Sequence, residues 1–335
     1  MRALLRYHGG KMRLSPKLIA IFPPHRIYTE VFGGGASVLL QKPRVYSELY
    51  NDLDGEVVNV FRVLQNRRKA ARLEELLRAT PYAREEFELG YKAARSDIER
   101  ARRTIIRSFM GFGSDSISRL KASRAGFNTR ISSLVSSGGF RTSPRIIARA
   151  SNLSSLMSTA FRSNANRSGT TPASDWRSYP DCLHYYVERL QGVTIENRNA
   201  FELLPAFDRE DALHYLDPPY PISVRKTANG STPEHRYRWE MNDDDHARLA
   251  ALARTLQGAV IISSYPNPVY DELFAGWRKI SWTGGQFCSA NTHAQTRTET
   301  VWMNARAWAG TPRQLFDDFE AVSPEPRVAS EEATA

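Results

Sequence analysis

Cysteine is scarce in this 335-residue chain, and long apolar runs are missing. The two cysteines, Cys182 and Cys288, stand far apart without Cys-x-x-Cys spacing, so neither a disulfide framework nor a zinc site is expected. No stretch approaches the roughly 20 apolar residues that a membrane span needs, and Met1–Arg6 is too short for a signal peptide. We therefore expect a soluble protein of the cytoplasm.

Acidic residues are scarce in one part of the chain. The formal net charge is +10, but the segment from Arg62 to Arg177 holds 23 Lys and Arg residues against 9 Asp and Glu, which leaves the remainder at −4. A segregated basic region is typical of a protein that binds a polyanion, because each neutralised phosphate releases counterions. A solvated helical face rich in arginine would give the same count, so charge alone leaves both interpretations open.

Four residues near the middle, Asp217-Pro218-Pro219-Tyr220, carry the clearest chemical information. They follow the apolar run Ala212–Leu216, which we expect to be a buried strand because it is short and stops at a double proline. In open α/β sheets, ligands bind at the carboxyl ends of strands. Because proline has no backbone N–H group, the motif presents acceptors, the Asp217 carboxylate and the Pro218 carbonyl, beside an aromatic ring. This arrangement suits a planar ligand with an amino group, such as a nucleobase.

A glycine-rich turn follows the first expected strand. Ile27–Val31 runs into Phe32-Gly33-Gly34-Gly35, and Val38-Leu39-Leu40 is expected to begin a helix. Strand, glycine turn and helix form the first unit of a nucleotide-binding sheet, in which glycines let the backbone approach the ligand. The next expected strand, Arg44–Glu48, ends near Asp52, which is placed to accept hydrogen bonds from ribose hydroxyls or to cap the following helix.

A second glycine pair lies earlier, in Tyr7-His8-Gly9-Gly10-Lys11. Two glycines permit a tight backbone turn against a ligand, and the Lys11 ammonium could meet an anion. Many such turns are purely structural, so the motif gains weight only from its neighbours.

The basic segment changes character between Gly111 and Ser174, where Ser, Gly, Asn and Arg predominate. Interleaved basic and aromatic side chains on a mobile loop could contact phosphates and wedge or stack bases. A disordered basic loop without that role is the alternative. The candidate contacts to a nucleic acid are Arg119, Lys121, Arg124, Phe127, Asn128 and Arg130.

The remaining pattern alternates helices with strands. Helical spacing covers residues 53–110, 179–190 and 243–256, and strands are expected at 193–197, 258–263 and 300–303. Residues 237–241 form an aromatic and charged loop. Residues 311–335 have few periodic apolar positions and are expected to be a disordered tail.

The order of these motifs resembles that of the Dam-like class of adenine-specific DNA methyltransferases. The set comprises the Gly-Gly-Lys turn, Phe-Gly-Gly-Gly after a strand, Asn-Asp after the next strand, a basic insertion and Asp-Pro-Pro-Tyr, over roughly residues 5–305. Softer matches are Gly126-Phe127-Asn128, Ser263-Ser264-Tyr265 and Arg297-Thr298-Glu299. The ordered set is far more specific than any one of its members.

The resemblance implies roles for the matching residues. The catalytic motif, which would hold the target adenine, is Asp217, Pro218, Pro219 and Tyr220. The pocket for the methyl donor, S-adenosylmethionine, would be formed by Tyr7, Gly9, Gly10, Lys11, Phe32, Gly33, Gly34, Gly35, Asp52 and Asn199. No metal is implied.

Three positions depart from the family's pattern. Val31 replaces a proline that is often found before the Phe-Gly turn, and His8 stands at a position that is usually small. Asn199 occupies a position where many members place an aspartate, so a contact to the donor or to the base may differ. None of the three removes the catalytic motif.

Together these observations predict a discontinuous α/β protein. We expect a Rossmann-like methyltransferase sheet from residues 1–60 and 180–310, with a mainly helical, basic DNA-recognition insertion at 61–179. The expected activity is methylation of adenine N6 in double-stranded DNA, with one adenine flipped out, by a monomer of bacterial, phage or prophage origin. The alternatives are methylation of cytosine N4 in DNA or of adenine in RNA, and a nucleic-acid-binding relative without activity. Whether a restriction enzyme accompanies it stays open.

Overall fold

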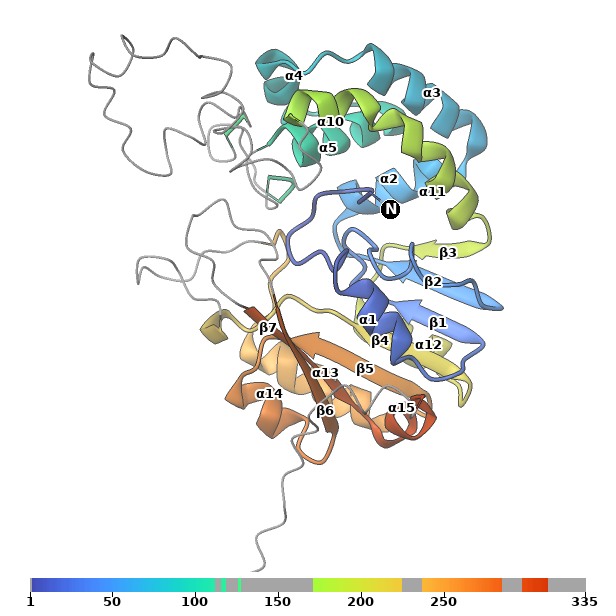
Figure 1. Ribbon diagram of the computed structural model, residues 1–335, viewed down its shortest axis with the longest axis vertical. Helices are drawn as coiled ribbons and strands as arrows, with labels where there is room; N and C mark the ends of the chain where they lie inside the picture. The colour runs from blue at the N-terminus through green and yellow to red at the C-terminus, as the bar shows by residue number, and fades with distance from the viewer. Residues whose placement is uncertain are drawn as a thin grey trace, which may run out of the picture.

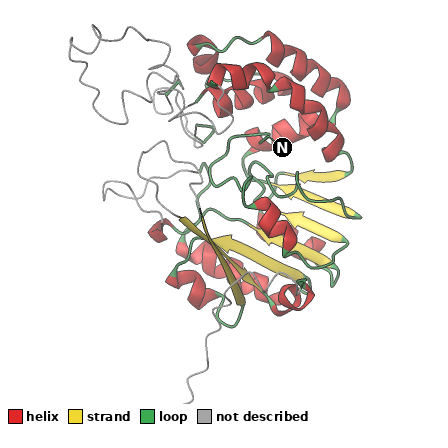
Figure 2. Ribbon diagram, in the orientation of Figure 1, coloured by secondary structure: helices red, strands yellow, loops and turns green. Residues whose placement is uncertain are grey.

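The computed structural model describes residues 2–111, 116–118, 126–127, 171–224, 237–284 and 297–312. These residues form a seven-stranded sheet with helices on both faces (Figure 1, Figure 2). The strands are β1 (Ile27–Glu30), β2 (Ser47–Asn51), β3 (Val193–Glu196), β4 (Ala212–Leu216), β5 (Ala259–Ser264), β6 (Arg278–Gly284) and β7 (Arg297–Met303). Their order across the sheet is β3-β2-β1-β4-β5-β7-β6.

The direction of strand addition reverses between β1 and β4. Strand β1 pairs in parallel with β2 on one side and with β4 on the other, and β5 continues the parallel series. Strand β7 is antiparallel to both β5 and β6. Ligands of open α/β sheets bind in the crevice at such a reversal, outside the carboxyl ends of the strands. The fold is thus Rossmann-like, as the sequence predicted, and places the ends of β1, β2 and β4 around one crevice.

Alternate strand residues face two separate cores, as the pleat requires. Tyr215 and Ile261 belong to the core covered by α1 (Ser15–Ala20), α2 (Gly55–Gln65), α11 (Leu183–Leu190) and α15 (Ala305–Gly310). Leu216 and Ile262 belong to the core covered by α12 (Ala200–Phe207), α13 (Asp243–Thr255) and α14 (Pro268–Leu273). Because both faces are covered, β4 and β5 are buried along their whole length and are apolar almost throughout.

The remaining helices gather beyond the β3 edge of the sheet (Figure 1). Here α2 and α11 pack with α3 (Arg67–Ala79), α4 (Arg84–Leu89), α5 (Asp97–Met110) and α10 (Pro172–Ser178). Asp54, Asn66 and Ser96 accept hydrogen bonds from first-turn backbone N–H groups and so cap α2, α3 and α5. The apolar faces of this group continue the core of the sheet. The boundaries of a separate insertion at 61–179 stay a prediction.

The segment after the glycine turn differs from the predicted helix. Residues 37–41 form turns, in which the Leu40 N–H group donates to Ala36 O at 3.0 Å and the Lys42 N–H group to Val38 O at 2.9 Å. Pro43 explains the difference, because a residue that precedes proline is disfavoured in the helical conformation. Strand β6 is absent from the predicted set, and β7 begins at Arg297 rather than at Thr300.

Candidate active site

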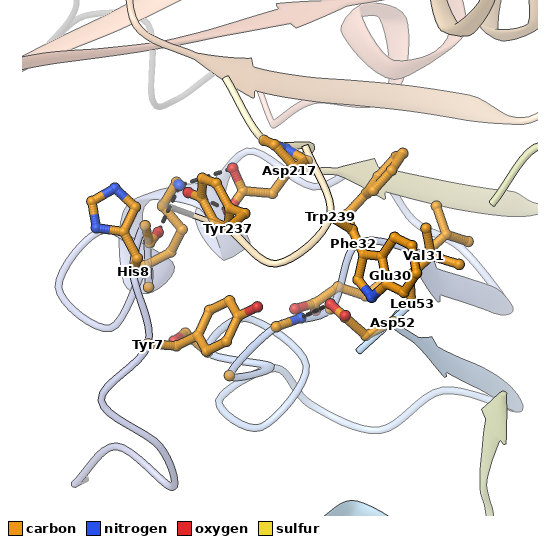
Figure 3. Close-up of a pocket in the computed structure, with 18 of the residues that line it drawn as sticks. Tyr7, His8, Glu30, Val31, Phe32, Asp52, Leu53, Asp217, Tyr237 and Trp239 are labelled. Atoms are coloured by element: carbon orange, nitrogen blue, oxygen red, sulfur yellow. Dashed lines mark hydrogen bonds and ion pairs between the residues drawn. The ribbon is translucent and has the colours of Figure 1, made fainter. Parts of the chain in front are cut away.

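One cavity lies at the carboxyl ends of β1, β2 and β4 (Figure 3). It joins the glycine turns near the N-terminus to the Asp-Pro-Pro-Tyr motif, although these lie some two hundred residues apart in the chain. Its lining residues are Tyr7, His8, Gly9, Gly10, Lys11, Glu30, Val31, Phe32, Gly33, Gly34, Gly35, Ser37, Val38, Asp52, Leu53, Ala200, Tyr215, Asp217, Pro219, Tyr237, Trp239, Glu240 and Met241.

The turn after β1 requires its glycines. Gly34 has φ +47°, in the left-handed region that residues with a Cβ rarely adopt. A Cβ at Gly33 would lie 2.2 Å from the ring of Tyr50, so this position must stay bare for the turn to pack against β2. The Gly33 N–H group donates to Asn51 O at 2.8 Å, which ties the turn to the end of β2.

Asp52 bridges the same turn to the start of α2. Its Oδ2 accepts a hydrogen bond from the Gly34 N–H group at 2.8 Å, and its Oδ1 accepts one from the Asp54 N–H group at 2.7 Å. Asp54, rather than Asp52, caps α2. Burial raises the pKa of Asp52 to about 6, although the backbone hydrogen bonds act in the opposite direction. Asp52 is therefore a carboxylate at neutral pH and a carboxylic acid at mildly acidic pH.

Glu30, at the end of β1, is a second carboxyl group in the cavity wall. Its Oε2 accepts hydrogen bonds from the Tyr28 hydroxyl and from the Leu39 N–H group, both at 2.8 Å. Burial raises its pKa from 4.5 to about 8, so Glu30 is mainly protonated at neutral pH.

Asp217, directly after β4, is held by a lysine and a serine. Lys11 Nζ lies 2.8 Å from both carboxylate oxygens and also donates to Gly9 O at 2.9 Å. The Ser263 hydroxyl donates to Asp217 Oδ1 at 2.8 Å. Burial by itself lowers the pKa of Lys11, but the charges of Asp217 and Glu299 outweigh it, so the pKa is raised. The pair is charged and mostly buried, with side-chain exposures of 6% and 18%.

Tyr220 lies under this pair. Its hydroxyl donates to Glu299 Oε2 at 2.8 Å, and its ring meets that of Tyr265 edge to face, with 4.8 Å between centroids. Lys11 Nζ lies 5.0 Å from the Tyr220 ring centroid, within the range of a cation–π contact. Burial raises the pKa of Tyr220 well above its ordinary value, with Asp217 and Glu299 adding to the effect, so the hydroxyl keeps its proton.

The segment Tyr237–Met241 covers the other side of the cavity. The Tyr237 ring packs at 5.2 Å from His8 and at 6.4 Å from Tyr7, between centroids. Trp239 is 54% exposed although it lines the cavity, and it lies near Phe32 and Asp52 in Figure 3. An exposed indole at a cavity mouth offers a flat apolar surface to a ligand.

Comparison with known proteins decides the family. A sequence model described as D12 class N6 adenine-specific DNA methyltransferase matches residues 7–282. The chain belongs to this family. It is therefore an enzyme that methylates N6 of adenine in DNA. A search of curated proteins found no match.

Most of the residues predicted for the methyltransferase site meet in the cavity. The predicted residues that line it are Tyr7, Gly9, Gly10, Lys11, Phe32, Gly33, Gly34, Gly35, Asp52, Asp217 and Pro219. Pro218 and Tyr220 are buried behind it. Exposed Asn199 caps α12 by accepting a hydrogen bond from the Phe201 N–H group at 3.0 Å, and its neighbour Ala200 reaches the lining. The roles of these residues stay proposals.

Other residues of the methyltransferase site were not predicted. Glu30 stands at the end of an expected strand without a signal of its own, and Trp239 lies in a loop whose aromatic content was its only signal. Glu299 was indicated only by the softer family match Arg297-Thr298-Glu299, which gave it no role beside Tyr220. Each gains its place from tertiary contacts, which no local pattern in the sequence specifies.

The predicted DNA contacts of the methyltransferase fall mostly outside the described residues: Arg119, Lys121, Arg124, Asn128 and Arg130. Phe127 is described, and its ring packs at 5.2 Å from Tyr82 and 5.8 Å from Phe87, with Arg84 over its face. In this position Phe127 attaches its segment to the helical group. Its contact with DNA stays a prediction.

Part of the basic excess is neutralised within the methyltransferase itself. Arg102 and Arg103 of α5 both pair with Glu99, and Arg100 pairs with Glu56. Arginines that are already paired release fewer counterions from DNA.

The described residues contain no cluster of His, Cys, Asp and Glu suited to a metal, and none of their helices is long and apolar enough to cross a membrane.

Proposed function

We propose that this methyltransferase takes the methyl group from S-adenosylmethionine, bound at the glycine turn and Asp52, and directs it to an adenine held at Asp217. The proposal is supported chiefly by the single cavity that contains both groups of residues. A shared cavity is what direct transfer needs, because donor and acceptor must approach in line without an intervening barrier.

The cavity has features that suit this donor. Phe32, Leu53 and Trp239 provide apolar surface for the adenine ring of the donor. The Asp52 carboxylate lies at the end of β2, where acidic residues of related sheets accept hydrogen bonds from ribose hydroxyls. The bare backbone at Gly34 leaves room for the ring of Tyr7, which lines the cavity, since a Cβ there would lie 2.9 Å from that ring. The methionine end would lie toward Tyr7 and Gly9–Lys11, and Asn199 would lie near the donor or the base.

When bound, the donor supplies an electrophilic methyl group, and the protein's task is to prepare the acceptor. The lone pair of an adenine amino group is delocalised into the ring, which makes it a poor nucleophile. Hydrogen bonds from this group to the Asp217 carboxylate and the Pro218 carbonyl favour a pyramidal nitrogen and stabilise the positive charge that develops on it. Asp217 need not be a strong base, because the proton becomes acidic only after methylation and water can accept it.

Lys11 has to yield its position when the base enters. Its ammonium donates to the same two oxygens that the adenine amino group would use, and it covers the ring of Tyr220. A like-charged group beside the developing cation would oppose the reaction. Entry of the adenine therefore requires Lys11 to move away from Asp217.

The adenine must leave the helix to reach these groups. A stacked base is inaccessible to a recessed carboxylate, so the enzyme would flip the nucleotide and hold the base against Tyr220. The basic segment 61–179 would bind the surrounding double-stranded DNA, in keeping with its charge. We expect a monomer that acts on DNA in the bacterial cytoplasm, whether the gene is chromosomal or carried by a phage.

Replacement of Asp217 tests the proposal. Asp217→Ala should lower the rate of methyl transfer by at least ~100–1000-fold, because it removes one stabilising partner of the transition state. Donor affinity, measured by calorimetry, should stay within a few-fold of the wild type. Asp217→Asn keeps the shape and an acceptor oxygen, and should retain more activity than alanine.

Nucleosides from treated DNA, analysed by mass spectrometry, identify the methylated base, and sequencing of modified DNA from expressing cells gives the recognition site. Near wild-type transfer by Asp217→Ala would overturn the role of this residue. N4-methylcytosine as the product would overturn adenine as the target.

A further inference from the structure

Glu299 is a buried charged residue that belongs to neither the donor-binding nor the acceptor motif. It lies on β7, is 7% exposed and does not line the cavity. Its Oε2 accepts the hydrogen bond from the Tyr220 hydroxyl at 2.8 Å. Burying a carboxylate costs free energy unless hydrogen bonds compensate for the missing water. One partner that compensates it here is the hydroxyl of Tyr220, the aromatic residue of the catalytic motif.

The bond to Glu299 fixes where the Tyr220 ring lies. Rotation about Cα–Cβ would carry the hydroxyl away from Glu299, whereas the hydroxyl oxygen lies on the extended Cβ–Cγ axis and does not move when the ring turns about that bond. Rotation about Cβ–Cγ is limited instead by Tyr265, which packs edge to face against the ring with an interplanar angle of 80°. The ring is thus fixed at its tip and by its neighbour.

The Lys11 ammonium lies over the Tyr220 ring, at a position that a ligand could occupy. Lys11 Nζ lies 5.0 Å from the ring centroid and 2.8 Å from the Asp217 carboxylate oxygens. A group at that point therefore meets the aromatic ring and the acceptor together. A planar base with an amino group can satisfy both only if the ring keeps its orientation relative to the carboxylate, since stacking weakens when the rings tilt.

We propose that Glu299 is a positioning residue for the target base, which holds the Tyr220 ring through its hydroxyl in the place where it stacks on a flipped adenine. The inference rests on the proposed function of Asp217 and Tyr220. Glu299 does not line the cavity, so we assign its effect on the base to its contact with Tyr220, while its charge also acts on Lys11.

The experiment compares two DNA duplexes that contain the recognition site, one with the target adenine and one with an abasic nucleotide in its place. Both are bound in the presence of sinefungin, a donor analogue that carries no transferable methyl group. The ratio of the two dissociation constants combines the contacts to the base with the cost of unpairing it, and because that cost is the same for every variant, a change in the ratio reports a change in the contacts. A merely structural defect would weaken both duplexes equally and leave the ratio unchanged.

We expect Glu299→Ala and Tyr220→Phe each to reduce this ratio about tenfold, because each removes the same charge-assisted hydrogen bond. The double variant should lose little more than either single one, since both changes break one interaction. Glu299→Gln keeps an acceptor oxygen and should stay within about twofold of the wild type. Thr298→Ala is the matched control, because Thr298 is the adjacent β7 residue and its hydroxyl pairs with Thr283.

Several results would overturn the inference: an unchanged ratio in Glu299→Ala, a Glu299→Gln variant as defective as Glu299→Ala, or fully additive losses in the double variant. Calorimetry with sinefungin shows which variants have folded, and if Glu299→Ala has not, Glu299→Gln and Tyr220→Phe carry the test. Failure of the proposed function looks different, since Asp217→Ala would then transfer methyl groups at a rate near that of the wild type.

Discussion

Lys11 and Asp217 form an ion pair in which one ammonium group bonds both oxygens of one carboxylate, each at 2.8 Å. The pair occupies the point where the adenine amino group is expected to bind. The Lys11 ammonium thus offsets the free-energy cost of burying the Asp217 carboxylate before a base binds there.

The first prediction concerns the stability of this pair. Lys11→Met and Asp217→Asn should each lower the free energy of unfolding by roughly 3 kcal/mol, because each leaves an uncompensated group in a mostly buried site. The double variant should lose clearly less than the sum. Urea unfolding of the four proteins measures the coupling.

The exposed Arg72–Glu75 pair on α3 is the control. Its variants Arg72→Met and Glu75→Gln should change stability by less than about 1 kcal/mol. Purely additive losses at Lys11 and Asp217 would show that the two residues do not depend on one another.

The second prediction concerns pH and Glu30. Its pKa is about 8 in the folded chain and 4.5 ordinarily, so between these values the folded state holds a proton that the unfolded state has released. Stability should therefore fall as the pH rises from about 4.5 to 8. Glu30→Gln removes the titrating group and should be more stable than the wild type by roughly 1–4 kcal/mol at alkaline pH, with little difference in acid.

Unfolding in urea across this pH range checks the prediction. Glu202→Gln, an exposed change on α12, should follow the wild-type profile. Parallel profiles for the wild type and Glu30→Gln would contradict the assigned proton.

The third prediction concerns donor binding and Asp52, whose pKa is about 6. The ionised carboxylate is the stronger acceptor for ribose hydroxyls, so affinity for S-adenosylmethionine should rise several-fold as the pH passes from below to above that value. Calorimetry at a series of pH values measures this affinity. Asp52→Asn should bind the donor more weakly, and its affinity should not rise around this pH. Titration of the donor itself affects both proteins equally, so it cancels when the two affinity profiles are compared. A step of the same size in Asp52→Asn would assign the titration to another group.

The fourth prediction concerns DNA and salt. Replacing Arg119, Lys121, Arg124 and Arg130 together by alanine should weaken DNA binding and reduce the slope of log affinity against log salt by about 0.9 for each phosphate that the variant no longer neutralises. The matched control replaces four cations of α3 that pair with carboxylates, Arg67, Lys69, Arg72 and Arg78. Titrations at several salt concentrations measure both slopes. Equal slopes for the two variants would place the DNA surface elsewhere.

The backbone of the site was predictable because it follows from strand ends. Ala212–Leu216 forms β4 as predicted, and Ile27–Glu30 forms β1, so the positions of Asp217 and of the glycine turn follow from the chemistry of parallel sheets. The helix predicted at Val38 does not form, because Pro43 follows closely and disfavours the helical conformation at Lys42. Whether a short helix forms thus depends on the residue that ends it as well as on the residues that begin it.

The side-chain partners were not predictable. Lys11 was expected to meet an anion, but nothing in the sequence shows that the anion is Asp217. Trp239 and Glu299 reach the site from a loop and from an antiparallel strand, and their positions depend on packing between distant segments. The family resemblance supplied the order of motifs, whereas the contacts among them come from the tertiary structure.

The position of β7 constrains how the enzyme is made. Although β7 is the last strand in the part of the chain that the structure describes, it lies between β5 and β6, and β6 pairs with β7 along its whole length. During synthesis β6 therefore emerges from the ribosome with no strand to join, and Glu299 reaches Tyr220 only when β7 follows. A stop codon before residue 297 would leave β6 as an unpaired strand, which is an aggregation hazard. The contact between Glu299 and Tyr220 can therefore form only after the chain has been translated through β7.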